Sequence, residues 1–94
     1  MIEGFRGKVT EAVFNGECPK GFPPDLAKVA RRKLKMIEAA VILDDLRVPP
    51  GNKLHKLKGD RLGQYAIWIN DQYRICFYWL EGKAQTVEIV DYHE

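Results

Sequence analysis

The chain closes with side chains that can transfer protons near neutral pH. In the terminal "VDYHE", a carboxylate, a phenol and an imidazole follow one another as Asp91, Tyr92 and His93. The only other histidine of the chain is His55, inside the segment "KLHKLKGDR". Histidine serves as base or acid because its ordinary pKa, about 6.5, lies near working pH. The two histidines are therefore the first candidates for acid–base catalysis.

Two cationic residues could bind a phosphate group beside these histidines. RNA cleavage without a metal needs a base for the 2′-hydroxyl proton, a cation for the phosphorane and an acid for the leaving 5′-oxygen. Lys58 offers a point charge, whereas Arg74 offers a planar fork for two phosphate oxygens. Asp91 could orient a histidine or act as base, and Tyr92 could stack on a nucleobase or donate to phosphate. The residue types suit RNA cleavage, and they leave open which group is base and which is acid.

Each of these residues also has a purely structural interpretation. A terminal "DYHE" is often a polar end, and His55 or Lys58 can be ordinary surface residues of a basic segment. Strand alternation places His55 and Lys58 on opposite faces, so both reach one site only if the chain bulges or turns near Gly59. Arg74 is the hardest to explain in this way. In the middle of a sheet, its guanidinium needs solvent or a matching anion.

Composition and charge narrow the classes of protein. With 94 residues, 46% hydrophobic and 30% charged, the chain suits one domain over residues 1–94. The net charge is +2, yet nine of the 15 lysines and arginines fall in "KVARRKLK" and "KLHKLKGDR". Such patches suit a polyanionic partner, although the first is also typical of a solvated helix face. The two cysteines favour a reduced cytosol, and no signal peptide, membrane span or zinc-ligand spacing is visible.

The hydrophobic pattern predicts helices first and strands afterwards. After a short strand at 2–5, a helix that Gly16 ends is expected over 8–16, and an amphipathic helix over about 24–42. Strands are expected over 54–59, 63–69, 72–80 and 84–92. Tight turns between the last three predict an antiparallel meander. The expected fold class is α+β, with two N-terminal helices packed on one face of an antiparallel sheet.

The other face of this sheet should be open. Alternation along 72–80 places Ile75 and Phe77 on the core face, and Arg74 and Cys76 on the open face. An open sheet face with an arginine at its centre is a natural place for a functional site.

Long motifs in the second half resemble a known family. The stretch "PPGNKLHKLKGDRLGQYAIWINDQYRICFYW", followed by "VEIVDYH", resembles the HigB (host inhibition of growth) toxins of the RelE/ParE superfamily. The most specific parts are "LKGDR.G", "W.N..YRI.F" and the terminal "DYH", and the likeness covers nearly the whole chain. Members of that family are small α+β proteins that enter the ribosomal A site and cut messenger RNA.

The resemblance also carries over site residues. Position by position, the family's catalytic residues would be His55, Lys58, Arg74, Asp91, Tyr92 and His93. Two departures are Tyr73, where a tryptophan is often found, and the trailing Glu94, whose negative charge could lower activity modestly.

The resemblance implies a ribosome-dependent messenger-RNA endoribonuclease of a type II toxin–antitoxin system. It would act in the cytoplasm without a metal or other cofactor, by 2′-hydroxyl attack that leaves a 2′,3′-cyclic phosphate. Its partners would be the ribosome, messenger RNA and a helix-turn-helix (HigA-like) antitoxin, with operator DNA reached only through the antitoxin complex and no membrane involved. The alternatives are a gyrase-inhibiting toxin like the ParE branch, or a non-catalytic module that only binds an antitoxin.

Overall fold

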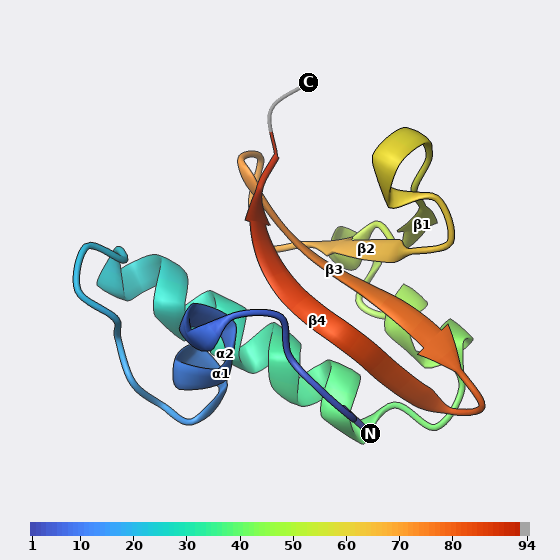
Figure 1. Ribbon diagram of the computed structural model, residues 1–94, viewed down its shortest axis with the longest axis horizontal. Helices are drawn as coiled ribbons and strands as arrows, with labels where there is room; N and C mark the ends of the chain where they lie inside the picture. Colours follow the sequence, from blue (N-terminus) through green and yellow to red (C-terminus); the bar gives the residue numbers. More distant parts are fainter. Residues whose placement is uncertain (93–94) are drawn as a thin grey trace.

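Two helices cover one face of a four-stranded antiparallel sheet in the computed structural model, which describes residues 1–92 (Figure 1). The helices are α1 (Lys8–Phe14) and α2 (Pro24–Ala39). The strands are β1 (His55–Lys56), β2 (Tyr65–Trp68), β3 (Tyr73–Leu80) and β4 (Lys83–Asp91). They pair in the order β1-β2-β3-β4. The predicted α+β class and the antiparallel meander are both confirmed.

The main core lies between the helices and the sheet face predicted to be buried. Ile75 and Phe77 are fully buried there, in one cluster with Leu34 and Ile37 of α2. Complete burial of such side chains stabilises a fold by about 1.5–3 kcal/mol each. On the opposite face, Cys76 belongs to a second, smaller apolar cluster. The predicted alternation along β3 is therefore confirmed.

Helix α2 ends earlier than the sequence pattern predicts. Ala40 already has extended backbone angles, φ −66° and ψ 133°. The amides of Val41 and Ile42 donate to Asp45 Oδ2 at 2.9 and 3.1 Å, which turns the chain into the 3-10 helix η1 (Leu43–Arg47). Val41 continues the apolar spacing of the helix, but it is exposed. The local aspartate acceptor overrides the helical period at this end.

The N-terminal segment lies along the outer edge of β4. Ile2 and Phe5 form isolated parallel bridges with Ala84 and Val87, so the strand expected at 2–5 is present only as these bridges. Hydrogen bonds from Glu3 N to Ala84 O (2.8 Å) and from Arg6 N to Val87 O (3.0 Å) hold the segment in place. This edge pairing fixes the position of Arg6 beside β4.

The strand expected over 54–59 is much shorter than predicted. Only His55 and Lys56 pair with β2, and the 3-10 helix η3 (Gly59–Arg61) follows. Gly59 has φ +64°, a conformation that glycine adopts without strain. The chain therefore turns at Gly59, as a shared site for His55 and Lys58 would require.

A buried polar pair joins α2 to the 3-10 helix η2 (Pro50–Asn52). The ammonium of Lys33 donates to Asn52 Oδ1, and Asn52 Nδ2 donates to Leu46 O at 3.1 Å. Asn52 is fully buried, and Lys33 is nearly so. Burial lowers the pKa of Lys33, because the loss of water disfavours the charged form.

We expect Asn52→Leu to lower the free energy of unfolding by about 2–3 kcal/mol, since it leaves a buried ammonium and a buried carbonyl without partners. Adding Lys33→Met should recover part of this loss, because an apolar pair needs no hydrogen bond. Urea denaturation of the single variants and the double variant measures the coupling. Losses that simply add would show that the two side chains act independently.

Candidate active site

Three of the predicted site residues lie around one hollow on the protein surface. The hollow has a volume of about 320 Å³ and is lined by Lys58, Asp60, Arg61, Val90, Asp91 and Tyr92. The first three residues come from the turn at η3, and the last three come from the end of β4 and the residue after it. The structure therefore brings together Lys58, Asp91 and Tyr92.

The turn after β1 carries Lys58 to the hollow. Lys58 itself has an extended backbone, and the left-handed Gly59 then reverses the chain into η3. Hydrogen bonds from Leu57 N to Gln64 O (2.9 Å) and from Arg61 N to Lys58 O (3.3 Å) close the loop. This closed loop places Lys58 in the lining of the hollow.

The end of β4 is fixed by a neighbouring turn. The Tyr92 amide donates to Gln72 O at 2.8 Å, and Gln72 Nε2 donates to Asp91 Oδ2 at 3.1 Å. Tyr92 also packs against the second apolar cluster, whose buried members are Leu57, Ala66 and Cys76. These contacts hold the carboxylate and the phenol beside Lys58.

Arg74 lies on the open face as predicted, but its partners differ from those expected. Its Nη1 donates to the carbonyls of Asn70 and Tyr73, the latter at 3.2 Å. Its guanidinium carbon lies 3.7 Å from the centre of the Trp68 ring and 5.7 Å from that of Tyr92. Arg74 is only 7% exposed. The expectation that it needs solvent or an anion is wrong for the free protein, because carbonyls and aromatic faces take that place.

Trp68 is a neighbour of the site that the sequence reasoning missed. Lys53 Nζ lies 3.8 Å from the same ring centre that the Arg74 guanidinium approaches at 3.7 Å. The Trp68 ring therefore contacts two cations. Trp68 and Arg74 are also directly opposite in the β2–β3 register. The motif "W.N..YRI.F" carried this signal, since a hairpin brings its tryptophan and arginine together.

Asn70 of the same motif shapes the turn between β2 and β3. Its Oδ1 accepts hydrogen bonds from the amides of Gln72 (2.9 Å) and Tyr73 (2.7 Å). Asparagine favours such local bonds in turns. The turn places the Asn70 carbonyl where Arg74 donates to it.

His55 lies on the open face, at the edge of the sheet. It shares the register row His55–Ala66–Cys76–Glu88, but it is exposed and does not line the hollow. Its Nδ1 lies 2.7 Å from Lys53 O, and a carbonyl can only accept. A neutral ring in this position therefore carries its proton on Nδ1 and has Nε2 available as a base. The other predicted histidine, His93, lies outside the described residues.

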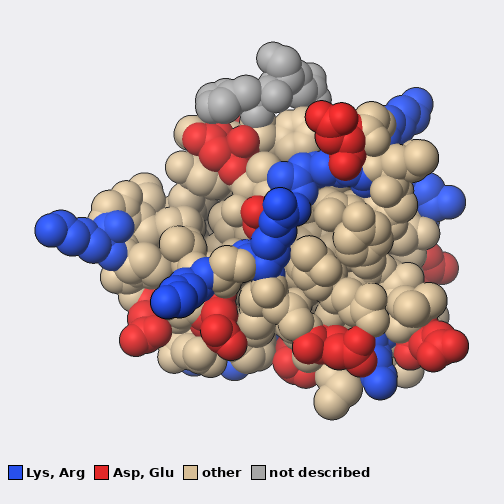
Figure 2. Space-filling model, viewed as in Figure 1, with Lys and Arg blue, Asp and Glu red and all other residues tan. Residues whose placement is uncertain are grey.

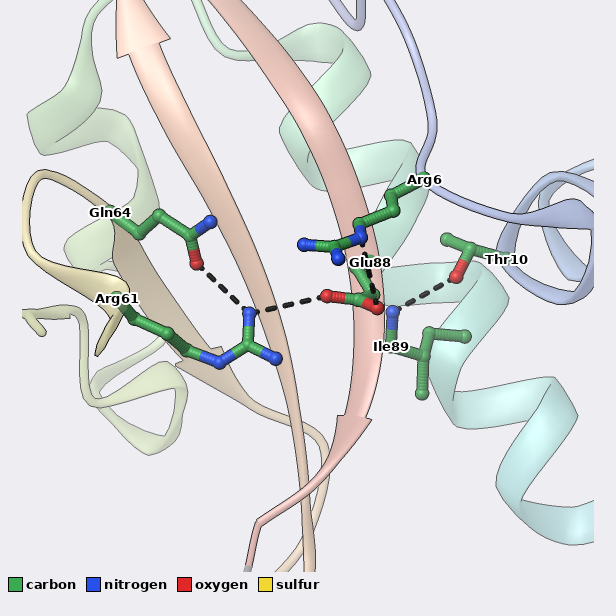
Figure 3. A network of polar contacts seen from close by, with 6 residues as sticks. All are labelled: Arg6, Thr10, Arg61, Gln64, Glu88 and Ile89. Atoms are coloured by element: carbon green, nitrogen blue, oxygen red, sulfur yellow. Dashed lines mark hydrogen bonds and ion pairs between the residues drawn. The ribbon is translucent and has the colours of Figure 1, made fainter.

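A charged network, also missed from the sequence, borders the hollow (Figure 3). Arg61 Nη1 donates to Glu88 Oε1 at 3.2 Å and to Gln64 Oε1 at 3.1 Å. Arg6 Nε lies 3.9 Å from Glu88 Oε2. In the sequence, Arg61 was only one of the basic residues of its segment. Glu88 lies 27 positions away from it, a separation that no local pattern reveals.

Cys76 lies beneath the charged groups of this face. It is completely buried, and burial raises the pKa of its thiol to about 11. A thiol with such a pKa stays protonated near neutral pH and is a poor nucleophile.

Within residues 1–92, no group of three or more His, Cys, Asp or Glu side chains is placed to hold a metal ion. In the same part of the chain, no helix is both long and apolar enough to cross a membrane.

Comparison with known proteins identifies the family. Residues 3–93 match the model of a family described as the RelE-like toxin of type II toxin–antitoxin system HigB. "Endoribonuclease HigB" from Proteus vulgaris is 31% identical over 93 residues, which cover 99% of this chain and all of that protein. "Toxin HigB-1" from Vibrio cholerae is 40% identical over 62 residues, and the match spans 66% of this chain and 65% of that protein.

A solved structure shares the fold. The "YoeB-YefM complex from Staphylococcus aureus" contains a chain that aligns with a TM-score of 0.58 and 17% identity, covering 100% of this chain and 99% of that one. The family match over almost the whole chain is independent of that likeness. The chain belongs to the HigB family of RelE-like toxins of type II toxin–antitoxin systems.

Proposed function

We propose that this protein is an endoribonuclease that cuts messenger RNA in the A site of the ribosome. The observation that carries the proposal is the hollow in which Lys58, Asp91 and Tyr92 meet, immediately before His93 in the sequence. The guanidinium carbon of Arg74 lies 5.7 Å from the centre of the Tyr92 ring. A full-length relative named "Endoribonuclease HigB" supports the same activity.

The proposed reaction is an internal transfer within the RNA strand. The 2′-oxygen attacks the phosphorus while a base accepts its proton, and the bond from phosphorus to the 5′-oxygen breaks as an acid protonates that oxygen. The products are a 2′,3′-cyclic phosphate and a 5′-hydroxyl, so atoms and charge balance without a metal or cofactor. Lys58 and Arg74 stabilise the phosphorane, and His55, Asp91 and His93 are the groups that can exchange the protons.

The three candidates for proton transfer differ in where they lie in the structure or in the sequence. Asp91 belongs to the lining of the hollow, and His93 follows one residue after Tyr92. His55 instead approaches from the sheet edge, with Nε2 as its available base. We therefore propose Asp91, together with His93 on the strength of its place in the sequence, for proton transfer at the phosphate, and His55 for contact with RNA that extends from the hollow towards β1.

The proposed partners follow from the family. The similar solved structure is named as a complex, and the chain belongs to a family of toxin–antitoxin systems. We propose a helix-turn-helix, HigA-like antitoxin as the protein partner and operator DNA as a partner of that complex only. Because the proposed target is the ribosome, the proposed site of action is the cytoplasm.

A translation reaction tests the proposal directly. Because the net charge is only +2, free RNA should bind weakly, and cutting should depend on the ribosome as the carrier of the message. We expect one transcript to be cut when it is being translated and to stay intact at the same protein concentration without ribosomes. Gel analysis of both reactions measures this difference. Efficient cutting of the naked transcript would contradict ribosome dependence, and an uncut message in both would contradict the proposed function.

A further inference from the structure

Arg61 belongs both to the hollow and to the charged network beside it. It lines the hollow together with Lys58 and Tyr92. Its Nη1 makes both of the polar contacts described for it, to Glu88 and Gln64 (Figure 3). Among residues 1–92, the structure gives no other polar partner to its remaining N–H groups. An arginine has five N–H donors, so most of its fork remains available to a further acceptor.

Small residues of the sheet make room for this arginine. Arg61 starts in η3, outside β1 and β2, and reaches Glu88 on β4 across the open face. The residues in register between them, Ala66 and Cys76, are short and completely buried. The Arg61 guanidinium can therefore lie across the sheet, where longer side chains would displace it.

Arg6 reaches the same carboxylate from the opposite side. The pairing of Arg6 N with Val87 O (3.0 Å) ties its backbone to β4. In the first turn of α1, Thr10 Oγ1 accepts a hydrogen bond from Ile89 N at 2.9 Å, so the β4 backbone is anchored on both sides of Glu88. Three segments far apart in the sequence thus converge on Glu88.

The network contains more positive than negative charge. Glu88 accepts from Arg61 at 3.2 Å and faces Arg6 at 3.9 Å, so one carboxylate is shared by two guanidinium groups. The side chain of Arg6 is 65% exposed, whereas those of Arg61 and Glu88 are 28% and 25% exposed. A line of Lys and Arg side chains crosses the middle of the face drawn in Figure 2, with acidic surface beside it.

We propose that Arg6 and Arg61 form a second phosphate-binding site for the RNA strand beside the hollow, and that Glu88 occupies this site in the free protein. A carboxylate and a phosphate present similar oxygen pairs to a guanidinium, so Glu88 stands in for the anion. Glu88 thereby holds both arginines in place and weakens the binding of free RNA. This proposal rests on the proposed ribonuclease function, because it assumes that RNA passes through the hollow.

An acidic segment of an antitoxin is the other anion that two arginines could bind. RNA is favoured because Arg61 lines the same hollow as Lys58, Asp91 and Tyr92. A strand that places one phosphate there can place a neighbouring phosphate at Arg61.

The test measures binding of the full-length protein to a non-cleavable single-stranded RNA of twelve 2′-O-methyl nucleotides, at several salt concentrations. Glu88→Gln removes the competing charge and keeps an acceptor, so affinity should rise roughly three- to tenfold. The slope of log affinity against log salt should steepen by about 1. Arg61→Gln and Arg6→Gln should each weaken binding, and in the double Arg variant the gain from Glu88→Gln should disappear.

Asp44→Asn is the matched control. It makes the same change in net charge and releases Arg47, which Asp44 binds at 3.0 Å in η1. We expect its RNA affinity to change less than twofold. Thermal midpoints show which variants are folded, and the comparison of Glu88→Gln with Asp44→Asn decides the proposal even if Arg61→Gln does not fold.

The outcomes separate this site from the proposed function. If Glu88→Gln has the same RNA affinity and salt slope as Asp44→Asn, there is no second phosphate site, even where wild-type protein cuts messages on ribosomes. The gain predicted for Glu88→Gln would support the site, even if messages remained uncut. Loss of antitoxin binding by the Arg variants, with RNA affinity unchanged, would assign the arginines to the antitoxin and overturn the proposal.

Discussion

Loss of His93 should abolish messenger-RNA cleavage while the protein remains folded. A stop after Tyr92 removes His93 and Glu94, and acid–base groups of this kind contribute about 10²–10⁴-fold to rate. The expectation comes from the place of His93 in the sequence, next to a tyrosine that lines the hollow. Folding should persist because β4 ends at Asp91 and the Tyr92 amide is bound to Gln72 O at 2.8 Å.

Two controls isolate the imidazole. A stop after His93 removes only Glu94, and it should leave cleavage intact or slightly higher, because a negative charge two positions after the hollow-lining Tyr92 in the sequence is lost. His93→Gln in the full chain keeps the length and should be as inactive as the truncation. Thermal midpoint, growth arrest and message integrity are measured in the same strains. If a folded protein without His93 cuts messages at the wild-type rate, His93 has no catalytic role.

Arg74→Lys should slow single-turnover cleavage by about 10²–10³-fold, a loss of about 2.7–4 kcal/mol of transition-state stabilisation. Lysine keeps the charge but loses the planar fork. The free protein already holds this fork with the carbonyls of Asn70 and Tyr73 and with the face of Trp68. A lysine ammonium cannot make the same contacts while facing a phosphate. Wild-type single-turnover rates for Arg74→Lys would remove Arg74 from the site.

The variant Trp68→Leu tests whether Trp68 contributes to cleavage by holding Arg74 in position. Trp68 touches Arg74 and is not among the residues that line the hollow, so its loss should weaken the hold on Arg74 without removing a charge. We expect a smaller fall in rate than for Arg74→Lys, and an additional Arg74→Lys change should then cost less than it does alone. Losses that add fully would show that Trp68 does not act through Arg74.

Much of the sheet was predictable because its rules are local. Alternation along β3 placed Arg74 on one face and Phe77 on the other, and the turn residue Gly59 brought Lys58 to the hollow. The resemblance to HigB toxins pointed to the same side chains, and the family match confirms that membership.

The features that were not predicted depend on contacts between distant segments. The pairing of Lys33 with Asn52, the two cations on Trp68 and the shared carboxylate Glu88 each join separate elements. Arg74 illustrates the reason most clearly. The sequence showed that its charge needed compensation, but only the folded turn shows that backbone carbonyls and aromatic rings provide it.

The most direct measurement of the central claim is the position and chemistry of the cut end in a translated message. The account predicts cleavage within the codon in the ribosomal A site, a 2′,3′-cyclic phosphate on the upstream fragment, and loss of this product with Lys58→Gln. A 3′-hydroxyl end, or growth arrest with every message intact, would contradict it.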